Sequence, residues 1–332
     1  MNPLLEDFNT APFSKISSTD YKPAIKKTIE ICKQEIQTIV SNPETPNFQN
    51  TTEALEFTGQ KLGRITSIFF NLNSAETSEA IQKIALEISP WLSEFKNDMI
   101  LNSALFIKVK SVYDIRETLN LDPEQSMLLE KQYKGFSRNG ANLNDEDKEK
   151  LRKIDTELSR LSLQFGENVL ADGNAFELHI THEKDLKGLP DGAKEAASLL
   201  AKNRNKEGWL ITLDYPSYIP FVTYAENREL RKKLSIAFGK KGFQNNENNN
   251  EKIVLNIVNS RHQRANLLGY ETHAHFVLEE RMAETPEKVL SFSNDLLRKA
   301  KPAALREFKK LESFAKKLDG IDQLQKWDSA FY

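Results

Sequence analysis

Apolar residues recur at intervals of three and four along most of this chain, which is the spacing of one face of an α-helix. In residues 144–165 the apolar positions with this spacing are Leu151, Ile154, Leu158, Leu161 and Phe165. Three acidic residues, 145–147, come first, and acidic side chains favour the first turn because the N-terminal end of a helix carries partial positive charge. The pattern predicts an amphipathic helix with one buried face and one solvated face.

A second long helix is predicted over residues 285–318. Thr285 can cap it, Pro286 suits the first helical position and Gly320 supplies a stop. Pro302 is expected to kink this helix or to split it in two. Further helices are predicted over 21–41, 52–72, 78–101, 104–118, 123–133, 193–202, 226–238 and 249–268.

Strand signals are confined to one part of the chain, residues 174–180 and 208–213. The expected fold is therefore mainly α, with a small β element around residues 174–213. We expect Asp172 and Gly173 to end the long helix. This predicts an N-terminal helical domain over 1–171 and a second unit over 172–332, while the Asn-rich stretch 240–250 suits an exposed loop.

Composition narrows the class of protein. Of the 332 residues, 39% are hydrophobic, enough for a large core, and the net charge of −2 argues against a general nucleic-acid binder. No stretch approaches 18 consecutive apolar residues, so no membrane span is expected, and the N-terminus has no secretory signal. A lone cysteine, Cys32, fits a reducing compartment. These features predict a cytoplasmic protein with neither a nucleic-acid nor a membrane partner.

A complete active site is not visible in the residues. The zinc motif H-E-x-x-H is approached at His182 and Glu183, but Leu186 stands where the second histidine is needed. His273 and His275 are two apart in a helical context and so do not share a face. The remaining histidines are His179 and His262, the latter in a basic run expected at the surface. We therefore assign no catalytic, cofactor-binding or metal-binding residue.

Three other features of the sequence have simple structural interpretations. Cys32 lies at a helical position without an evident base and is read as a packed thiol. Basic residues at 231–233 and 298–317 are read as solvated helix faces. The aromatic-rich stretch 209–224 can line a groove for peptide side chains or can simply pack in the core, and the sequence leaves both readings open.

Several segments in order resemble one family, the thimet-oligopeptidase-like zinc metallopeptidases. They are NPLLEDFNTAPFSKI and YKPAI near the start, residues 121–176, 208–234 and 257–292, and the terminal KWDSAFY. The LLGY and FVLEERMA segments are more similar to the peptidyl-dipeptidase branch than to oligopeptidase A. The resemblance implies a mainly helical, neurolysin-like wall of a channel that admits short peptides.

The resemblance also implies a zinc ion held by H-E-x-x-H and a downstream glutamate, whose chemistry releases C-terminal dipeptides. No position of this chain matches those residues. We therefore expect an N-terminal portion, inactive alone and without zinc, whose partners are short peptides and a C-terminal catalytic half. The aromatic terminal segment favours a chain cut inside a folded region, and apolar surface left open there predicts self-association. An endo-acting, oligopeptidase A-like enzyme and a catalytically dead helical peptide-binding or scaffold protein remain alternatives.

Overall fold

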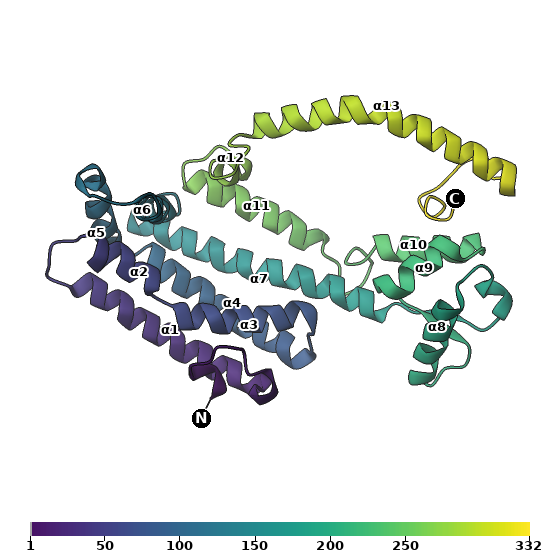
Figure 1. Cartoon of the computed structure of the whole chain (residues 1–332), viewed down its shortest axis with the longest axis horizontal. Coiled ribbons are helices and arrows are strands. Elements are labelled where there is room, and N and C mark those ends of the chain that lie inside the picture. The colour runs from purple at the N-terminus through teal and green to yellow at the C-terminus, as the bar shows by residue number, and fades with distance from the viewer. Residues whose placement is uncertain (1) are drawn as a thin grey trace. The chain divides into compact units, whose positions relative to one another are not determined.

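The computed structural model of the chain describes residues 2–332, which form two compact units (Figure 1). Unit 1 comprises residues up to 163 together with 256–276, and unit 2 comprises 164–255 together with 277–332. Each unit is thus built from two separate segments of the chain. The expected division at residues 171 and 172 into folding domains stays a proposal that limited proteolysis can test.

Unit 1 is helical. Its longer helices are α1 (Ser18–Ser41), α3 (Gln60–Ala75), α4 (Glu79–Ile100), α5 (Ser103–Asp114) and α6 (Pro123–Ser137). Shorter helical segments are η1 (Pro3–Leu5), η2 (Phe13–Lys15), η3 (Phe48–Glu53), α2 (Ala54–Phe57) and η4 (Arg116–Thr118). Parts of α7 (Asp145–Ala175), α11 (Glu251–Leu267) and α12 (His273–Leu278) complete it.

The main core of unit 1 forms where α1, α3 and α4 pack together. Tyr21 and Phe69 are almost fully buried there, with their ring centroids 4.9 Å apart in an edge-to-face arrangement. Cys32 belongs to the same core, where burial, with a smaller contribution from Glu35, raises the pKa of its thiol to about 11. The reading of Cys32 as a packed thiol is confirmed.

Unit 2 carries the β element. Strands β1 (Leu178–Ile180) and β2 (Trp209–Ile211) pair antiparallel, with His179 opposite Leu210. The helical elements are the end of α7, η5 (Glu183–Leu186), α8 (Asp191–Asn203), α9 (Tyr215–Tyr224), α10 (Arg228–Gly239), the start of α11, and α13 (Pro286–Asp319). The predicted fold class, mainly α with a small β element within 174–213, is confirmed.

The turn between β1 and α8 requires a glycine. Gly188 has a φ of +89°, and a Cβ atom there would lie 2.2 Å from the carbonyl oxygen of Tyr224. Only glycine reaches both this left-handed conformation and this close approach without strain.

The core of unit 2 lies against the sheet. Leu178 and Ile211, paired across the two strands, are buried there with Phe221 and Leu234.

Three helices differ from the expectations. The helix expected over 52–72 is interrupted at Thr58 and Gly59, between α2 and α3, where Thr58 is extended and Gly59 has a φ of +77°. Helix α7 continues through Asp172 and Gly173 to Ala175. The Asp172 carboxylate is buried and accepts hydrogen bonds from the backbone of Gly242 (2.8 Å) and the amides of Asn246 (2.8 Å) and Asn248 (3.1 Å). The Asn-rich loop is therefore tied to α7 by its amide groups, which local sequence patterns do not reveal.

The long C-terminal helix is not split. Helix α13 continues through Pro302, which is solvent-exposed. Proline removes one backbone hydrogen bond, and at an exposed position water can satisfy the carbonyl group that loses its partner.

Within residues 2–332, the structure contains no helix with the length and apolar content needed to cross a bilayer.

Candidate functional site

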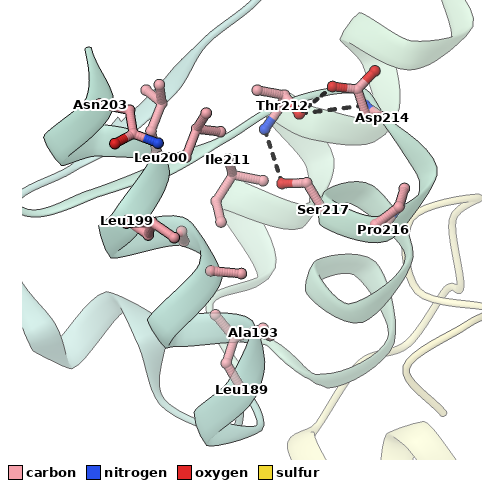
Figure 2. A pocket seen from close by; sticks show the side chains of 13 residues that line it. Leu189, Ala193, Leu199, Leu200, Asn203, Ile211, Thr212, Asp214, Pro216 and Ser217 are labelled. Carbon is pink, nitrogen blue, oxygen red and sulfur yellow. Dashed lines mark hydrogen bonds between the residues drawn. The ribbon is translucent and has the colours of Figure 1, made fainter.

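A groove in unit 2 lies where α8, β2 and α9 come together (Figure 2). Its volume is about 410 Å³. The lining is mostly apolar and consists of Leu189, Ala193, Ala196, Ala197, Leu199, Leu200, Asn203, Leu210, Ile211, Thr212, Asp214, Pro216 and Ser217. A cavity of this size and character suits one or two apolar side chains of a ligand.

The sequence of α8 accounts for the open space. Three alanines, at 193, 196 and 197, lie on the side of α8 that lines the groove, and their small side chains leave room beside the helix. Leu199 stands at the rim with 60% of its surface exposed, whereas Ala197 and Leu189 belong to the core beneath. The groove therefore has an apolar floor and an accessible apolar edge.

Polar groups occupy one end of the groove, where β2 leads into α9. The hydroxyl of Thr212 donates to Asp214 Oδ2 (2.9 Å), and the backbone N–H of Thr212 donates to Ser217 Oγ (3.0 Å), as Figure 2 shows. These bonds hold the start of α9 against β2. No histidine or lysine lines the groove beside Ser217, so this arrangement suits binding and does not assemble a nucleophile with its base.

The aromatic side chains of residues 209–224 mostly pack elsewhere. Tyr218 stacks on Phe238 with centroids 4.3 Å apart, Tyr215 meets the same ring edge-on at 5.8 Å, and Phe221 is fully buried. Phe221 is therefore a core residue and Tyr218 packs partly buried against the same core, but 67% of the Tyr215 surface is exposed. None of the described residues that line the groove is aromatic. The groove is lined by aliphatic and polar residues of the same stretch and by the alanines of α8. The close spacing of these alanines on one helix is the sequence feature that could have indicated the groove.

The histidines are dispersed. His179 lies on β1 with Nε2 2.6 Å from the carbonyl oxygen of Glu207, His182 precedes η5, and His262 is exposed on α11. His273 and His275 lie on α12, as the helical context predicts, with Nδ1 of His275 2.8 Å from the Thr272 hydroxyl. The part of the chain that the structure describes has no group of three or more His, Cys, Asp or Glu side chains placed to hold a metal ion. The residues present thus do not fit a zinc ion.

One basic cluster departs from expectation. Arg231 is not solvated, since only 1% of its surface is exposed, and it lies beside the fully buried Asp328. Arg228 makes two hydrogen bonds to that carboxylate, of 2.9 and 2.7 Å. The reading of 231–233 as a solvated face is therefore wrong for Arg231, because a partner almost a hundred residues away compensates its charge. The basic residues of 298–317 are exposed on α13, as predicted.

Comparison with known proteins finds similarity to peptidases. Residues 221–332 match peptidase family M3. Over the whole chain, identity is 32% across 335 residues to oligopeptidase A of Escherichia coli and 33% across 338 residues to dipeptidyl carboxypeptidase of the same organism. A probable cytosolic oligopeptidase A of Arabidopsis thaliana is 28% identical across 344 residues.

The alignments include 100% of this chain but 49%, 50% and 48% of these three relatives, respectively. The chain thus spans about half the length of the curated relatives it matches. The resemblance expected from the sequence is confirmed: residues 221–332 match peptidase family M3, and the whole chain is similar to oligopeptidase A and dipeptidyl carboxypeptidase.

Proposed function

We propose that this chain forms the N-terminal part of a cytoplasmic, zinc-dependent oligopeptidase that releases C-terminal dipeptides from short peptides. The observation that carries the proposal is the alignment of the entire chain with oligopeptidase A and dipeptidyl carboxypeptidase. The zinc ion and the catalytic residues would belong to polypeptide outside residues 1–332. We therefore derive no catalytic step from the side chains described above and propose that the chain is inactive alone.

Binding is the role that the described residues can serve. The groove of unit 2 offers an apolar floor at Ala197 and an accessible edge at Leu199, with polar groups at Thr212 and Asp214 at one end. An extended peptide has alternating side chains, so an apolar one can enter such a groove while its backbone stays near the polar end. The groove thus supports a contribution to peptide binding.

The surface of α13 supports a polypeptide partner. Along this helix only Ala315 is buried, and large apolar side chains on one side remain open to solvent at Leu290, Leu297 and Leu305. Apolar patches of this extent mark interaction surfaces. We propose that the catalytic half of the peptidase covers this face.

An endo-acting, oligopeptidase A-like activity is the second candidate. Identity is 32% to that enzyme and 33% to the dipeptidyl carboxypeptidase. The nearly equal values do not separate the two cleavage modes. Dipeptide release is proposed because the LLGY and FVLEERMA segments are more similar to the peptidyl-dipeptidase branch, and product analysis distinguishes the modes. A catalytically dead scaffold is the third candidate, and it predicts peptide binding without cleavage under every condition.

The test combines activity with product analysis. The chain is incubated with zinc and a short peptide, alone and after addition of the polypeptide that the gene encodes beyond codon 332. We expect no cleavage by the chain alone and chelator-sensitive release of C-terminal dipeptides with the added polypeptide, identified by mass spectrometry. Internal cleavage would establish the endo-acting mode. Chelator-sensitive cleavage by the chain alone, or a stop codon directly after codon 332, would overturn the proposal.

A further inference from the structure

A second cavity lies within unit 1, where α4, α7, α11 and α12 meet. Its volume is also about 410 Å³. Its lining is strongly polar and consists of Ser93, Lys96, Asn97, Asn139, Asp155, Leu158, Ser159, Ser162, Arg261, Arg264, His273 and Phe276. Three of these side chains carry a positive charge and one carries a negative charge, so the cavity has a positive surplus.

Arg264 is held in a fixed position within the cavity. Its Nε donates to Asp155 Oδ1 (2.7 Å), its Nη2 donates to Asn139 Oδ1 (3.1 Å), and its guanidinium carbon lies 5.0 Å from the centroid of the Phe276 ring. Only 14% of the Arg264 side chain and 18% of the Asp155 side chain is exposed. The single carboxylate of the lining is therefore already paired with Arg264.

The other two cations have no such partner. Among the interactions described for residues 2–332, neither Lys96 nor Arg261 takes part in an ion pair or a side-chain hydrogen bond, and both are exposed at the cavity rim. Because Asp155 compensates Arg264, these two side chains leave about two positive charges uncompensated. Like charges facing one cavity repel each other, and a bound anion relieves that repulsion.

Two enclosed polar side chains also lack partners. Only 5% of the surface of Asn97 is exposed, yet its Nδ2 makes no hydrogen bond in the described structure, and the same holds for Nδ1 of His273. Buried polar groups are nearly always hydrogen-bonded, so each exception requires an explanation.

The protonation state of His273 is also consistent with an anion in this cavity. Burial, together with the charges of Arg261 and Arg264, lowers the pKa of His273 below its ordinary value. The imidazole is therefore neutral at pH 7, with one N–H group to donate. Hydroxyl groups of Ser93, Ser159 and Ser162 add further donors to the lining.

We propose that this cavity is a binding site for a phosphate group, held by Arg261, Lys96 and the donors around Asn97. Two uncompensated positive charges match a phosphate dianion better than a carboxylate with a single charge. Hydroxyl and amide N–H donors supply the hydrogen bonds that the remaining oxygens need. This assignment rests on unit 1 alone and is independent of the proposed peptidase activity.

The direct test is calorimetric titration of the 332-residue chain with inorganic phosphate. Sodium chloride at equal ionic strength and sodium acetate serve as the comparison anions. We expect saturable binding of one phosphate per chain, at least tenfold tighter than acetate. Glycerol 3-phosphate, titrated in parallel, distinguishes a phosphate ester from the free ion, and tighter binding of either one supports the site.

Two variants locate the binding. Arg261→Gln should weaken phosphate binding about tenfold or more, because a charge-assisted hydrogen bond is lost. Lys252→Gln is the matched control, since it removes one exposed charge from the same helix but lies outside the lining, and it should change affinity less than twofold. Equal effects of the two variants, or acetate binding as tightly as phosphate, would overturn the proposal.

A third variant separates binding from folding. Asn97→Leu removes a buried group that lacks a partner, so we expect urea unfolding at the same or a higher midpoint. Phosphate affinity should nevertheless fall severalfold, because a donor is lost from the cavity. Unchanged affinity in this variant would show that Asn97 does not contact the anion and would overturn the site as assigned.

Discussion

The buried ion pair of unit 2 offers the sharpest test of the fold. Asp328 is fully buried and accepts two hydrogen bonds from Arg228, one from Arg231 (3.4 Å) and one from the backbone N–H of Gln325 (2.9 Å). Arg231 also donates to the carbonyl oxygen of Ala225 (2.7 Å). Replacing Asp328 by alanine removes the carboxylate but leaves the positive charge of Arg231 enclosed.

The Asp328→Ala substitution is expected to lower the free energy of unfolding substantially. Removing one partner of a buried ion pair costs about 3–5 kcal/mol, because the remaining charge stays buried without compensation. The total stability of a domain is about 5–15 kcal/mol. With a urea dependence of about 2 kcal/mol per molar, the Asp328→Ala unfolding midpoint should fall by roughly 2 M. Such a change affects the packing of the whole 325–332 segment.

The pH dependence has a definite sign. Burial alone would raise the pKa of Asp328, but hydrogen bonds from Arg228 and Gln325 and the charge of Arg228 outweigh it and lower that pKa below its ordinary value. A carboxyl group with a depressed pKa stabilises the fold above its unfolded-state pKa of about 3.9, and this stabilisation is lost as the pH falls through the folded-state pKa. The difference between wild type and Asp328→Ala should therefore be full at pH 7 and shrink below about pH 4.

The assay is urea unfolding followed by circular dichroism and by the fluorescence of the three tryptophans, one of which, Trp327, is the neighbour of the substituted residue. The matched control is the double variant Asp328→Leu with Arg231→Met, which removes both buried charges and should lose less stability than Asp328→Ala alone. An Asp328→Ala midpoint within about 0.3 M of wild type at pH 7 would refute the reasoning, as would a double variant less stable than the single one.

Three further outcomes test other parts of the structure. Cys32 should react with iodoacetamide at pH 8 at least 50-fold more slowly in the native chain than in urea, measured by mass spectrometry, because its pKa of about 11 leaves little thiolate. Asp172→Ala should cost about 1–3 kcal/mol and speed proteolysis within residues 240–250, since the loop amides lose their acceptor. The exposed apolar face of α13 should cause self-association at high concentration in sedimentation experiments, and Leu297→Lys should reduce it; a monomeric wild type would contradict this.

Periodicity alone predicted most of the helical fold, because amphipathic spacing reports which face of a helix is buried. The helix around Leu151 and the terminal helix after Thr285 both form where the pattern places them. The errors have a common origin in long-range contacts. Helix α7 passes the expected stop at Gly173 because Asp172, on its last turn, binds a loop 70 residues away. Local sequence windows do not contain that partner.

The candidate sites were harder to predict for the same reason. The groove of unit 2 depends on the small side chains of Ala193 and Ala197 on α8 lying beside β2, and the sequence pattern of α8 alone does not reveal that neighbour. The sequence showed a basic run around His262. It did not show that Arg261 and Arg264 would share a cavity with Asn97, which lies more than 160 residues earlier in the chain.

Comparison of the buried charges distinguishes structural sites from the proposed binding site. Around Asp172 and around Asp328, each carboxylate receives several hydrogen bonds from the chain itself, so these clusters need no ligand to be stable. The cavity of unit 1 differs, because its one carboxylate, Asp155, is paired with Arg264 while Nδ2 of Asn97 makes no hydrogen bond in the described structure. Folding gains nothing from an unpaired buried donor. A bound phosphate group would neutralise the surplus positive charge of Lys96 and Arg261, for which the described lining offers no second carboxylate.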